Sequence, residues 1–211
     1  MINLNSPALK CAGAVAVLLL SASSTALRAE GQQSLNDLEA GIARDHRDVH
    51  HLTPEQFEAA MQSPEKVLLL DARPEGEVGV SRLPGAIPVD PDIDSEAFLA
   101  RFGELARGRD VVIYCSVGVR SSKLASRVRH ALQENGAKRV ANLRGGIFAW
   151  HNTGRPLFDK VGNTEFVHPY SPRWTYYLDF KDLASYTARQ IDRQEDQPSR
   201  TPRPWSSYLP F

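Results

Sequence analysis

The chain has 211 residues, of which 42% are hydrophobic and 24% are charged, a composition typical of a soluble globular protein. Lys plus Arg and Asp plus Glu both number 25, so the formal net charge is zero with His neutral. This balance gives no support for nucleic acid or an anionic membrane surface as a partner. The length allows one ordinary domain with extensions, or two very small domains.

The first 29 residues have the pattern of a secretory signal peptide. Lys10 precedes an apolar run over residues 11–20, and small residues follow up to Ala26. A basic residue, a short apolar stretch and small residues before a cleavage site are the parts of such a signal. Cleavage is expected after Ala26 or Ala29. The alternative is that the uncleaved segment stays as a membrane anchor, although the apolar run is shorter than the ~20 residues of a spanning helix. We therefore expect export, with the periplasm as the compartment, and no stable membrane span in the mature form.

The cysteine content is informative in that context. The sequence has two cysteines, Cys11 and Cys115, and signal cleavage would remove the first. The mature protein would then hold one thiol and no internal disulfide. A lone Cys in an exported protein is either a buried core thiol or a reactive nucleophile, and composition does not distinguish the two.

In chain order, the sequence predicts alternating helices and strands after an irregular start. Residues 30–50 are polar without a clear apolar period and are expected to form a linker or arm. The sequence Thr-Pro-Glu-Gln at residues 53–56 predicts a helix start. The apolar run at residues 67–70 predicts a strand buried on both faces. A loop rich in Gly, Pro and charge is expected over residues 73–85, and residues 95–105 have helical spacing.

The alternation continues in the second half. Residues 111–114 form the clearest predicted strand, with three β-branched residues and no breaker. A helix is expected over residues 121–135, a strand over residues 140–143 and a short apolar helix around residues 147–150. Strands that alternate with helices favour an α/β fold of stacked layers, in which helices flank a mainly parallel central sheet.

After Pro156 the periodic pattern weakens. Residues 161–211 contain several aromatic residues first and then a polar end with prolines. We expect the first part to pack on the domain and the part from about residue 192 onward to be disordered. The expected organisation is therefore a signal peptide (1–29), a linker or arm (30–50), one domain (51–160) and a C-terminal extension (161–211).

Cys115 follows the strand at residues 111–114 and precedes a tight turn that contains Gly118. Backbone N–H groups in such a turn can point inward, and the start of the next helix adds partial positive charge. Both effects favour the thiolate of Cys115. Arg120 adds a fixed positive charge that lies at the rim or braces the loop. Ligands of open parallel sheets bind at the carboxyl ends of the strands, where this loop is expected.

Three motifs stand in order along the chain. The first is Asp-x-Arg with a Glu four residues further on and then a Pro-Gly-Ala turn (Asp71, Arg73, Glu77 and residues 84–86). The second is the strand and loop over residues 111–121. The third is Leu-x-Gly-Gly followed by a Trp and by Gly-Arg-Pro (residues 143–146, Trp150 and residues 154–156). In this order and at these spacings, the segment from about residue 51 to residue 158 resembles the rhodanese-like family.

The resemblance implies a three-layer rhodanese-like fold and sulfurtransferase activity. The Cys115 thiolate would take sulfur from a donor such as thiosulfate or a persulfide and form a persulfide itself. The sulfur would pass to cyanide, a small thiol or a protein thiol, and neither a metal nor an organic cofactor is needed. Substrate contacts are implied for the residues of the loop: Ser116, Val117, Gly118, Val119 and Arg120. Arg82 stands where the family often has His, and it is a further candidate for an anion contact, with a solvated side chain as the alternative.

Four charged residues upstream of the loop have structural interpretations. Asp71 and Arg73 are expected to form an ion pair that supports the site, because most such pairs are architectural. Glu75 and Glu77 are interpreted as solvated loop charges. His168, in the C-terminal extension, could approach the cleft as a base, but its motif indicates packing.

The length of the loop bears on the reaction. Related phosphatases carry Cys-x5-Arg, whereas four residues separate Cys115 from Arg120 here, which favours sulfur over phosphate as the bound group. Ser116 and Val117 supply no cation, so thiosulfate is only one of the candidate donors. A non-enzymatic sulfur carrier or protein-binding module, and a phosphatase or arsenate reductase, remain as alternative functions.

Overall fold

The computed structural model describes residues 34–190. The predicted signal peptide and the predicted disordered end lie outside these residues. Within them, five strands form one parallel sheet in the order β1-β5-β4-β2-β3. The strands are β1 (His50–Leu52), β2 (Val67–Asp71), β3 (Ile87–Pro88), β4 (Asp110–Tyr114) and β5 (Arg139–Leu143).

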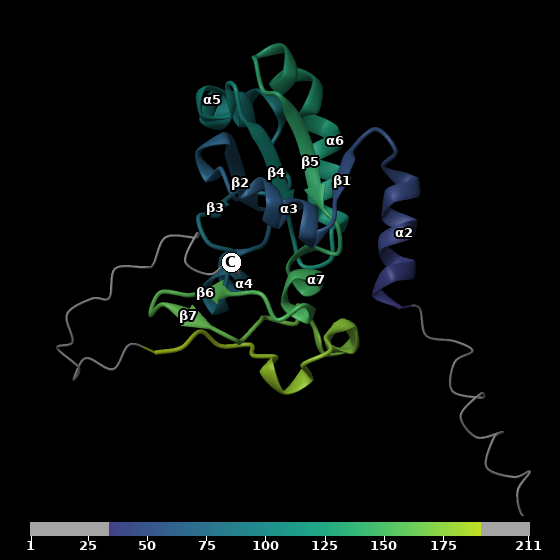
Figure 1. The fold of residues 1–211 in the computed structure, drawn as a ribbon, viewed down its shortest axis with the longest axis vertical. Coiled ribbons are helices and arrows are strands. Elements are labelled where there is room, and N and C mark those ends of the chain that lie inside the picture. Colours follow the sequence, from purple (N-terminus) through teal and green to yellow (C-terminus); the bar gives the residue numbers. More distant parts are fainter. Residues whose placement is uncertain (1–33, 191–211) are drawn as a thin grey trace, which may run out of the picture. The chain divides into compact units, whose positions relative to one another are not determined.

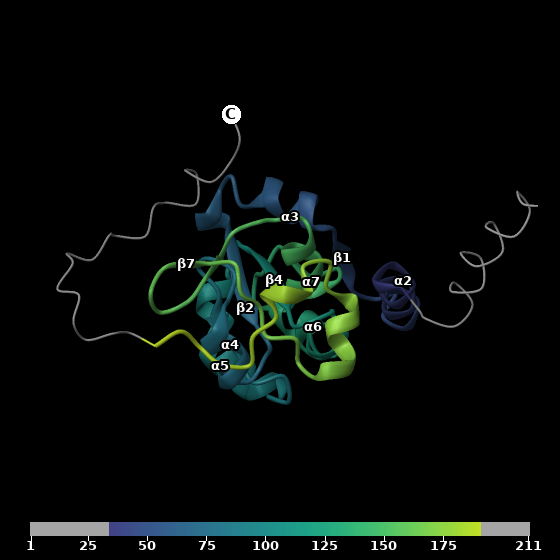
Figure 2. The same ribbon diagram turned by 90° about the horizontal axis from the view of Figure 1, so that it is seen from below.

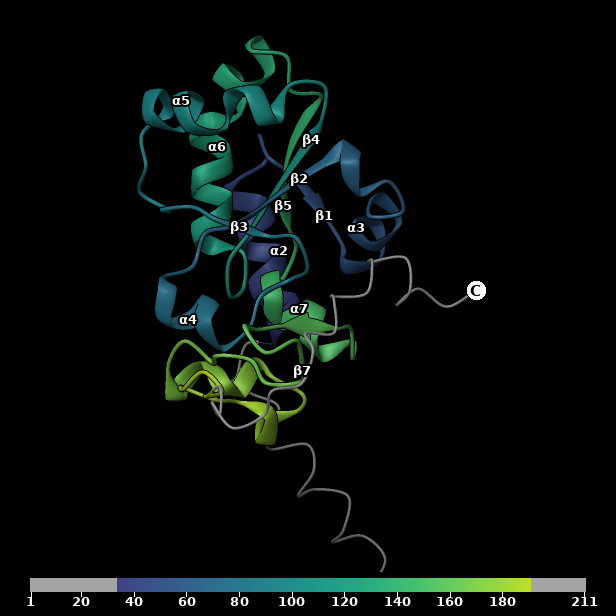
Figure 3. The same ribbon diagram turned by 90° about the vertical axis from the view of Figure 1, so that its left-hand side faces the viewer.

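Helices cover both faces of this sheet, as Figure 3 shows. One face packs against α5 (Ser95–Ala106) and α6 (Val119–Glu134), and the other packs against α3 (Pro54–Ala60) and α7 (Gly146–Asn152). Among residues 34–190, no helix combines the length and apolar character that a bilayer crossing requires. The three-layer α/β fold with a mainly parallel central sheet is confirmed.

The central strands β2 and β4 contain continuous apolar runs because both of their faces are buried. On β4, Val112 and Tyr114 point into the core beneath α3 and α7, while Ile113 and the following Cys115 belong to the core beneath α5 and α6. This alternation follows from the two-residue period of a strand. It places Cys115 at the carboxyl end of a fully buried central strand.

The helix start predicted at Thr53 is confirmed. The Gln56 N–H donates to the Thr53 hydroxyl at 3.3 Å, and the Thr53 N–H donates to the Gln56 side chain at 3.0 Å. The helix α3 buries Phe57, whose ring lies edge-on to Trp150 of α7 with 5.4 Å between the centroids. The closing motif of the sequence thus contributes to the same core as the first helix.

Residues 35–45, expected to be part of a linker or arm, form helix α2 (Leu35–Asp45). Ser34 and Asp37 form a capping box at its start. Glu39 is 7% exposed, and its carboxylate accepts a hydrogen bond from Arg144, which follows β5, at 2.8 Å. The helix is held by this ion pair and by apolar contacts, since Ile42 is buried and Leu35 and Leu38 pack against the core beneath α3 and α7.

The loop expected over residues 73–85 contains a short helix, α4 (Glu75–Val80). Its residues Val78 and Val80 are buried, while its two glycines weaken the helical pattern in the sequence. Pro74 stands at the N-cap, where its fixed φ is compatible with a helix start. The helix begins four residues after β2 and therefore lies at the carboxyl end of the sheet.

The C-terminal extension packs on the same end of the sheet. Figures 1 and 2 show it in yellow-green across the end at which α4 and α7 lie. Its strand β7 (Asn163–Thr164) pairs antiparallel with β6 (Leu157–Phe158), and two 3-10 helices follow, η2 (Pro172–Tyr177) and η3 (Lys181–Leu183). Val167 and Leu178 are buried in the core beneath α3 and α7, which explains how the segment is held.

Candidate active site

Cys115 lies in a turn between β4 and α6, and 1% of the residue is exposed. Gly118 has a φ of 105°, a left-handed conformation that Gly adopts without a steric penalty. This turn brings the Gly118 N–H to 3.2 Å from the Sγ atom of Cys115. The helix α6 begins at the next residue, so its partly positive N-terminus lies beside the sulfur. Both features suit a negatively charged sulfur.

Helix α7 sets the orientation of the loop peptides in residues 115–120, here called the Cys115 loop. The N–H groups of Ile147 and Phe148 donate to the carbonyl oxygens of Cys115 and Ser116 at 2.9 and 3.0 Å. In a trans peptide the N–H group and the carbonyl group point in opposite directions. The N–H groups of Ser116 and Val117, which belong to these two peptides, therefore face away from α7. Gly146 is required for this approach because a Cβ there would collide with the Cys115 carbonyl oxygen.

Glu77 was expected to be a solvated loop charge, and that expectation is wrong. It is 4% exposed and contacts two residues of the Cys115 loop. Ser116 donates to its Oε2 atom at 2.7 Å, and Arg120 donates to its Oε1 atom at 3.0 Å. Arg120 also donates to the Ser116 hydroxyl at 2.9 Å. The signal that could have identified Glu77 is its place in the Asp-x-Arg motif, combined with the buried side chain of Val78 beside it.

Asp71 and Arg73 form a second ion pair near the loop. Their side chains are fully buried, with 2.7 Å between Nη2 of Arg73 and Oδ2 of Asp71. The Tyr114 hydroxyl donates to the same carboxylate oxygen at 2.6 Å and accepts the Leu83 N–H at 3.1 Å. Burial raises the pKa of Tyr114 well above its ordinary value, so the phenol keeps the proton that it donates. That this pair supports the site stays a prediction.

A hydrogen-bond chain behind the loop was not predicted. The Ser121 hydroxyl donates to Oδ1 of Asn142 at 2.6 Å, and Nδ2 of Asn142 donates to Nδ1 of His51 at 3.2 Å. Burial lowers the pKa of His51, which favours the neutral ring that can accept this bond. The chain joins α6, β5 and β1 across large sequence separations, so no local pattern indicates it.

The predicted substrate-binding residues occupy different environments. Val117 is buried, and Val119 and Arg120 are half-buried at the start of α6. Arg82 exchanges two backbone hydrogen bonds with Phe158 of β6, at 2.8 and 2.9 Å, and is half-buried. The structure thus brings the loop residues together around Cys115. Substrate binding by these residues and by Arg82 stays a prediction.

The C-terminal extension reaches the Cys115 loop through Tyr170. The guanidinium carbon of Arg120 lies 5.2 Å from the centroid of the Tyr170 ring. Nδ1 of His168 accepts the Tyr170 N–H at 3.0 Å. The pKa of His168 is lowered mainly by burial, and the charges of Glu77, Arg73 and Arg120 also act on it. We call Glu77, Arg120, His168 and Tyr170 the mouth of the site.

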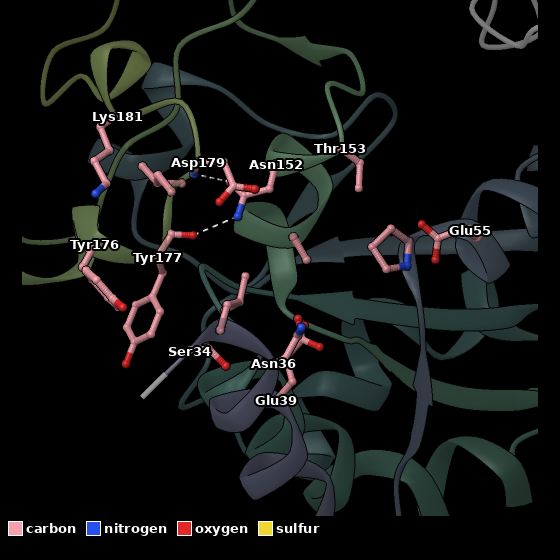
Figure 4. A pocket seen from close by; sticks show the side chains of 14 residues that line it. Ser34, Asn36, Glu39, Glu55, Asn152, Thr153, Tyr176, Tyr177, Asp179 and Lys181 are labelled. Atoms are coloured by element: carbon pink, nitrogen blue, oxygen red, sulfur yellow. Dashed lines mark hydrogen bonds between the residues drawn. The ribbon is translucent and has the colours of Figure 1, made fainter. Parts of the chain in front are cut away.

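Two hollows lie away from Cys115. One, of about 590 Å³, is bordered by α2, the start of α3, the end of α7 and η2, with Glu39, Asn152 and Tyr176 among its lining residues (Figure 4). The other, of about 840 Å³, is lined by residues that include His151 and Phe180. Within residues 34–190, no group of three His, Cys, Asp or Glu side chains is arranged to hold a metal ion. Neither of these hollows has a residue of the Cys115 loop among its lining residues.

Comparison with known proteins shows the family of the chain. The sequence profile of the rhodanese-like domain matches residues 53–153. A sulfurtransferase of Allochromatium vinosum is 34% identical over 114 residues, which cover 54% of this chain and 99% of that protein. The chain belongs to the rhodanese-like family, and the resemblance seen in the sequence is confirmed.

Other relatives contain a similar segment within longer chains. A tRNA uridine(34) hydroxylase of Bacillus pumilus is 35% identical over 104 residues, which cover 47% of this chain and 30% of that protein. Among solved structures, a thiosulfate sulfurtransferase from Pseudomonas aeruginosa is 23% identical, with a TM-score of 0.44, over 58% of this chain and 22% of that one. The matched segment thus spans nearly all of the Allochromatium vinosum protein and less than a third of the Bacillus pumilus protein.

Proposed function

We propose that the protein is a rhodanese-type sulfurtransferase that carries sulfane sulfur on Cys115. The observation that supports this most directly is the sulfur environment: the Gly118 N–H lies 3.2 Å from Sγ, at the start of α6. Such a site stabilises negative charge on sulfur both before and after transfer. Similarity to a sulfurtransferase over nearly all of that protein's length supports the same reaction class.

The reaction has two displacement steps at sulfur. In the first, the Cys115 thiolate attacks the outer sulfur of the donor, and the donor's sulfur–sulfur bond breaks. If the donor is thiosulfate, sulfite leaves with the electron pair and Cys115 becomes a persulfide with a negative terminal sulfur. In the second step, cyanide or a thiolate attacks that terminal sulfur, the persulfide bond breaks, and the Cys115 thiolate returns. The charges balance in both steps without a proton transfer.

The charges around the site bear on the donor. Arg120 is paired with Glu77 and Arg73 with Asp71, so each of these cations faces a carboxylate. A doubly charged anion such as thiosulfate gains less from compensated cations than from free ones. A persulfide, which carries less charge, is therefore the donor that this arrangement favours over thiosulfate.

The experiment that tests the function measures both steps. The protein is incubated with thiosulfate, or with glutathione persulfide, and its mass is measured before and after cyanide is added. We expect one added sulfur on Cys115 and formation of thiocyanate, and the variant Cys115→Ser should lose both. A protein that shows neither an adduct nor thiocyanate with any donor would contradict the proposal, and release of phosphate from an aryl phosphate would indicate a phosphatase.

A second candidate function is a sulfur carrier that acts only on a docked protein. The observation that favours it is the 1% exposure of Cys115, which limits attack by free acceptors. In the same experiment, a carrier would gain one sulfur but form no thiocyanate with cyanide. Transfer to a protein thiol would then be measured by mass.

We also propose that the protein is exported to the periplasm. The support is in the sequence, where Lys10 and the apolar run over residues 11–20 precede Ala26 and Ala29. Cell fractionation followed by N-terminal mass analysis tests this. A mature form that begins after Ala26 or Ala29 is expected, whereas a full-length chain in the cytoplasm would contradict it.

A further inference from the structure

The C-terminal extension contacts the Cys115 loop at a charged residue. The ring of Tyr170 lies over the Arg120 guanidinium, with 5.2 Å between the guanidinium carbon and the ring centroid. Tyr170 is 48% exposed, while the Arg120 side chain is 26% exposed. An aromatic ring that stays this exposed gains little from its own burial. Its position over a cation therefore calls for an explanation other than core packing.

The backbone at Tyr170 is strained. Its φ is 65°, and among the residues that the structure describes it is the only non-glycine residue with positive φ. A side chain in this left-handed region is disfavoured by contact between Cβ and the following carbonyl. Such conformations persist where the surroundings hold them, and they are concentrated at functional sites. The strain at Tyr170 is therefore maintained by the contacts around it.

Three neighbours hold the Tyr170 turn. The Tyr170 N–H donates to Nδ1 of His168 at 3.0 Å, and the Ser171 N–H donates to the Pro169 carbonyl at 2.7 Å. Trp174 contacts the Tyr170 ring edge-on, with 5.3 Å between the centroids. Because Nδ1 of His168 accepts a hydrogen bond, the neutral ring carries its proton on Nε2. Trp174 therefore constrains the Tyr170 ring, and the two hydrogen bonds constrain the backbone on either side of it.

The contacts of Arg120 extend the effect of Tyr170 into the loop. Arg120 donates to both carboxylate oxygens of Glu77, at 3.0 and 3.2 Å, and to the Ser116 hydroxyl at 2.9 Å. Ser116 is the residue next to Cys115. A guanidinium held on one side by Glu77 and on the other by Tyr170 has little freedom to swing away from the mouth of the site.

We propose that Tyr170 is a positioning residue for the sulfur-transfer reaction, which holds the Arg120 guanidinium on Glu77 and Ser116 at the mouth of the site. In this arrangement an anionic donor that approaches Cys115 passes a fixed guanidinium. The inference rests on the proposed function, to which it adds a role for the C-terminal extension. Tyr170 lies outside residues 53–153, which match the family profile, so the inference gives the C-terminal extension a part in selecting the sulfur donor.

The variant Tyr170→Gly isolates the ring, because Gly adopts the observed φ without strain. We expect Tyr170→Gly to raise KM for thiosulfate about three- to tenfold, the range of a partly exposed cation–π contact, with little change in kcat. Tyr170→Phe keeps the ring and should stay within about twofold of the wild type. Tyr176→Ala removes another exposed tyrosine of the extension and is the matched control, with KM unchanged.

A second measurement does not depend on sulfur transfer. Cys115 is alkylated with iodoacetate, which is anionic, and with iodoacetamide, which is neutral, and the ratio of the two rates is compared between variants. Tyr170→Gly should lower this ratio about three- to tenfold, because the guanidinium that attracts the anion is no longer fixed. Tyr170→Phe and Tyr176→Ala should leave it unchanged.

The two measurements separate the two proposals. If the wild-type protein transfers no sulfur from any donor, the proposed function fails, while the alkylation ratio still tests the position of Arg120. A folded Tyr170→Gly variant with wild-type KM and a wild-type ratio would overturn the inference. An equal loss in Tyr170→Phe would also overturn it, since it would assign the effect to the hydroxyl group. If Tyr170→Gly does not fold, Tyr170→Asn provides the ring-free comparison, because Asn tolerates the left-handed region better than other side chains do.

Discussion

Two ion pairs lie near Cys115, and they differ in exposure. Asp71 and Arg73 are fully buried, and Tyr114 donates to the same carboxylate. Glu77 is also buried, but its partner Arg120 is 26% exposed. Breaking a buried pair leaves an uncompensated charge in the interior, whereas a partly exposed charge can turn toward water. We therefore predict that the first pair mainly affects stability and that the second mainly affects the reactivity of Cys115.

The largest expected effect comes from breaking the buried pair. Asp71→Ala leaves the Arg73 charge buried and removes the acceptor of the Tyr114 hydroxyl, and it should lower the free energy of unfolding by about 3–5 kcal/mol. Urea denaturation measures this loss. The double variant Asp71→Ala, Arg73→Met should recover part of it, because the unpaired charge is gone. A loss below about 1 kcal/mol, the usual value of an exposed pair, would contradict the structural role.

The variant Glu77→Gln should lower stability less than Asp71→Ala does, and it should affect the reactivity of Cys115 more. The amide oxygen can still accept from Ser116, so the free energy of unfolding should fall by only about 1–2 kcal/mol. The Arg120 charge is no longer compensated, and the rate of Cys115 alkylation by iodoacetate, relative to iodoacetamide, should rise about twofold to tenfold. A fall in this ratio would show that Glu77 serves mainly to hold Arg120 in place. Tyr176→Ala serves again as the control.

The difference between these pairs also marks what the sequence can predict. Asp71, Cys115 and Gly118 were identified because their signals are local: an apolar strand followed by a polar residue, and a strand, turn and helix in succession. The burial of Glu77 was missed because it depends on Ser116 and Arg120, which lie 39 and 43 residues away. Helix α2 was missed although Leu35, Leu38 and Ile42 have helical spacing, because the polar residues between them obscure the apolar face and the ion pair of Glu39 with Arg144 is not a local signal.

The position of the C-terminal extension was likewise beyond local signals. Its aromatic residues predict packing but do not specify which surface they pack on. Tyr170 meets Arg120 across 50 residues of sequence, in a backbone conformation that Tyr rarely adopts. Tertiary contacts therefore decided the conformation here, against the preference of the residue itself.

The stability of the protein is expected to depend on pH through buried histidines, one of which is His151. Burial lowers the pKa of His151, which is 4% exposed and donates from Nε2 to the Glu165 carbonyl at 3.0 Å. As the pH falls, His151 of the unfolded chain takes up a proton near its ordinary pKa of 6.5, whereas His151 of the folded protein does so only at lower pH. The contribution of neutral His151 to the free energy of unfolding is therefore complete above pH 6.5 and is lost as the pH falls below it. Urea denaturation between pH 7.5 and pH 5.5 should show this loss.

The variant His151→Gln keeps a donor near the position of Nε2 and does not titrate in this range. Its stability should depend less on pH than that of the wild type, although His51 and His168, whose pKa values are also lowered, still contribute. An unchanged slope would assign the pH dependence to those two residues instead.

The smallest effect is expected at an ion pair with no contact to the loop. Arg129 on the outer surface of α6 donates to Asp48 at 2.9 Å, and both side chains are partly exposed, at 25% and 36%. Arg129→Ala should cost less than about 1 kcal/mol of unfolding free energy, because water compensates both charges. The KM for the sulfur donor and the alkylation ratio should not change. If Arg129→Ala altered the alkylation ratio as Glu77→Gln does, the change in the ratio would reflect the net charge of the whole protein. The two ion pairs near Cys115 would then differ only in their contribution to stability.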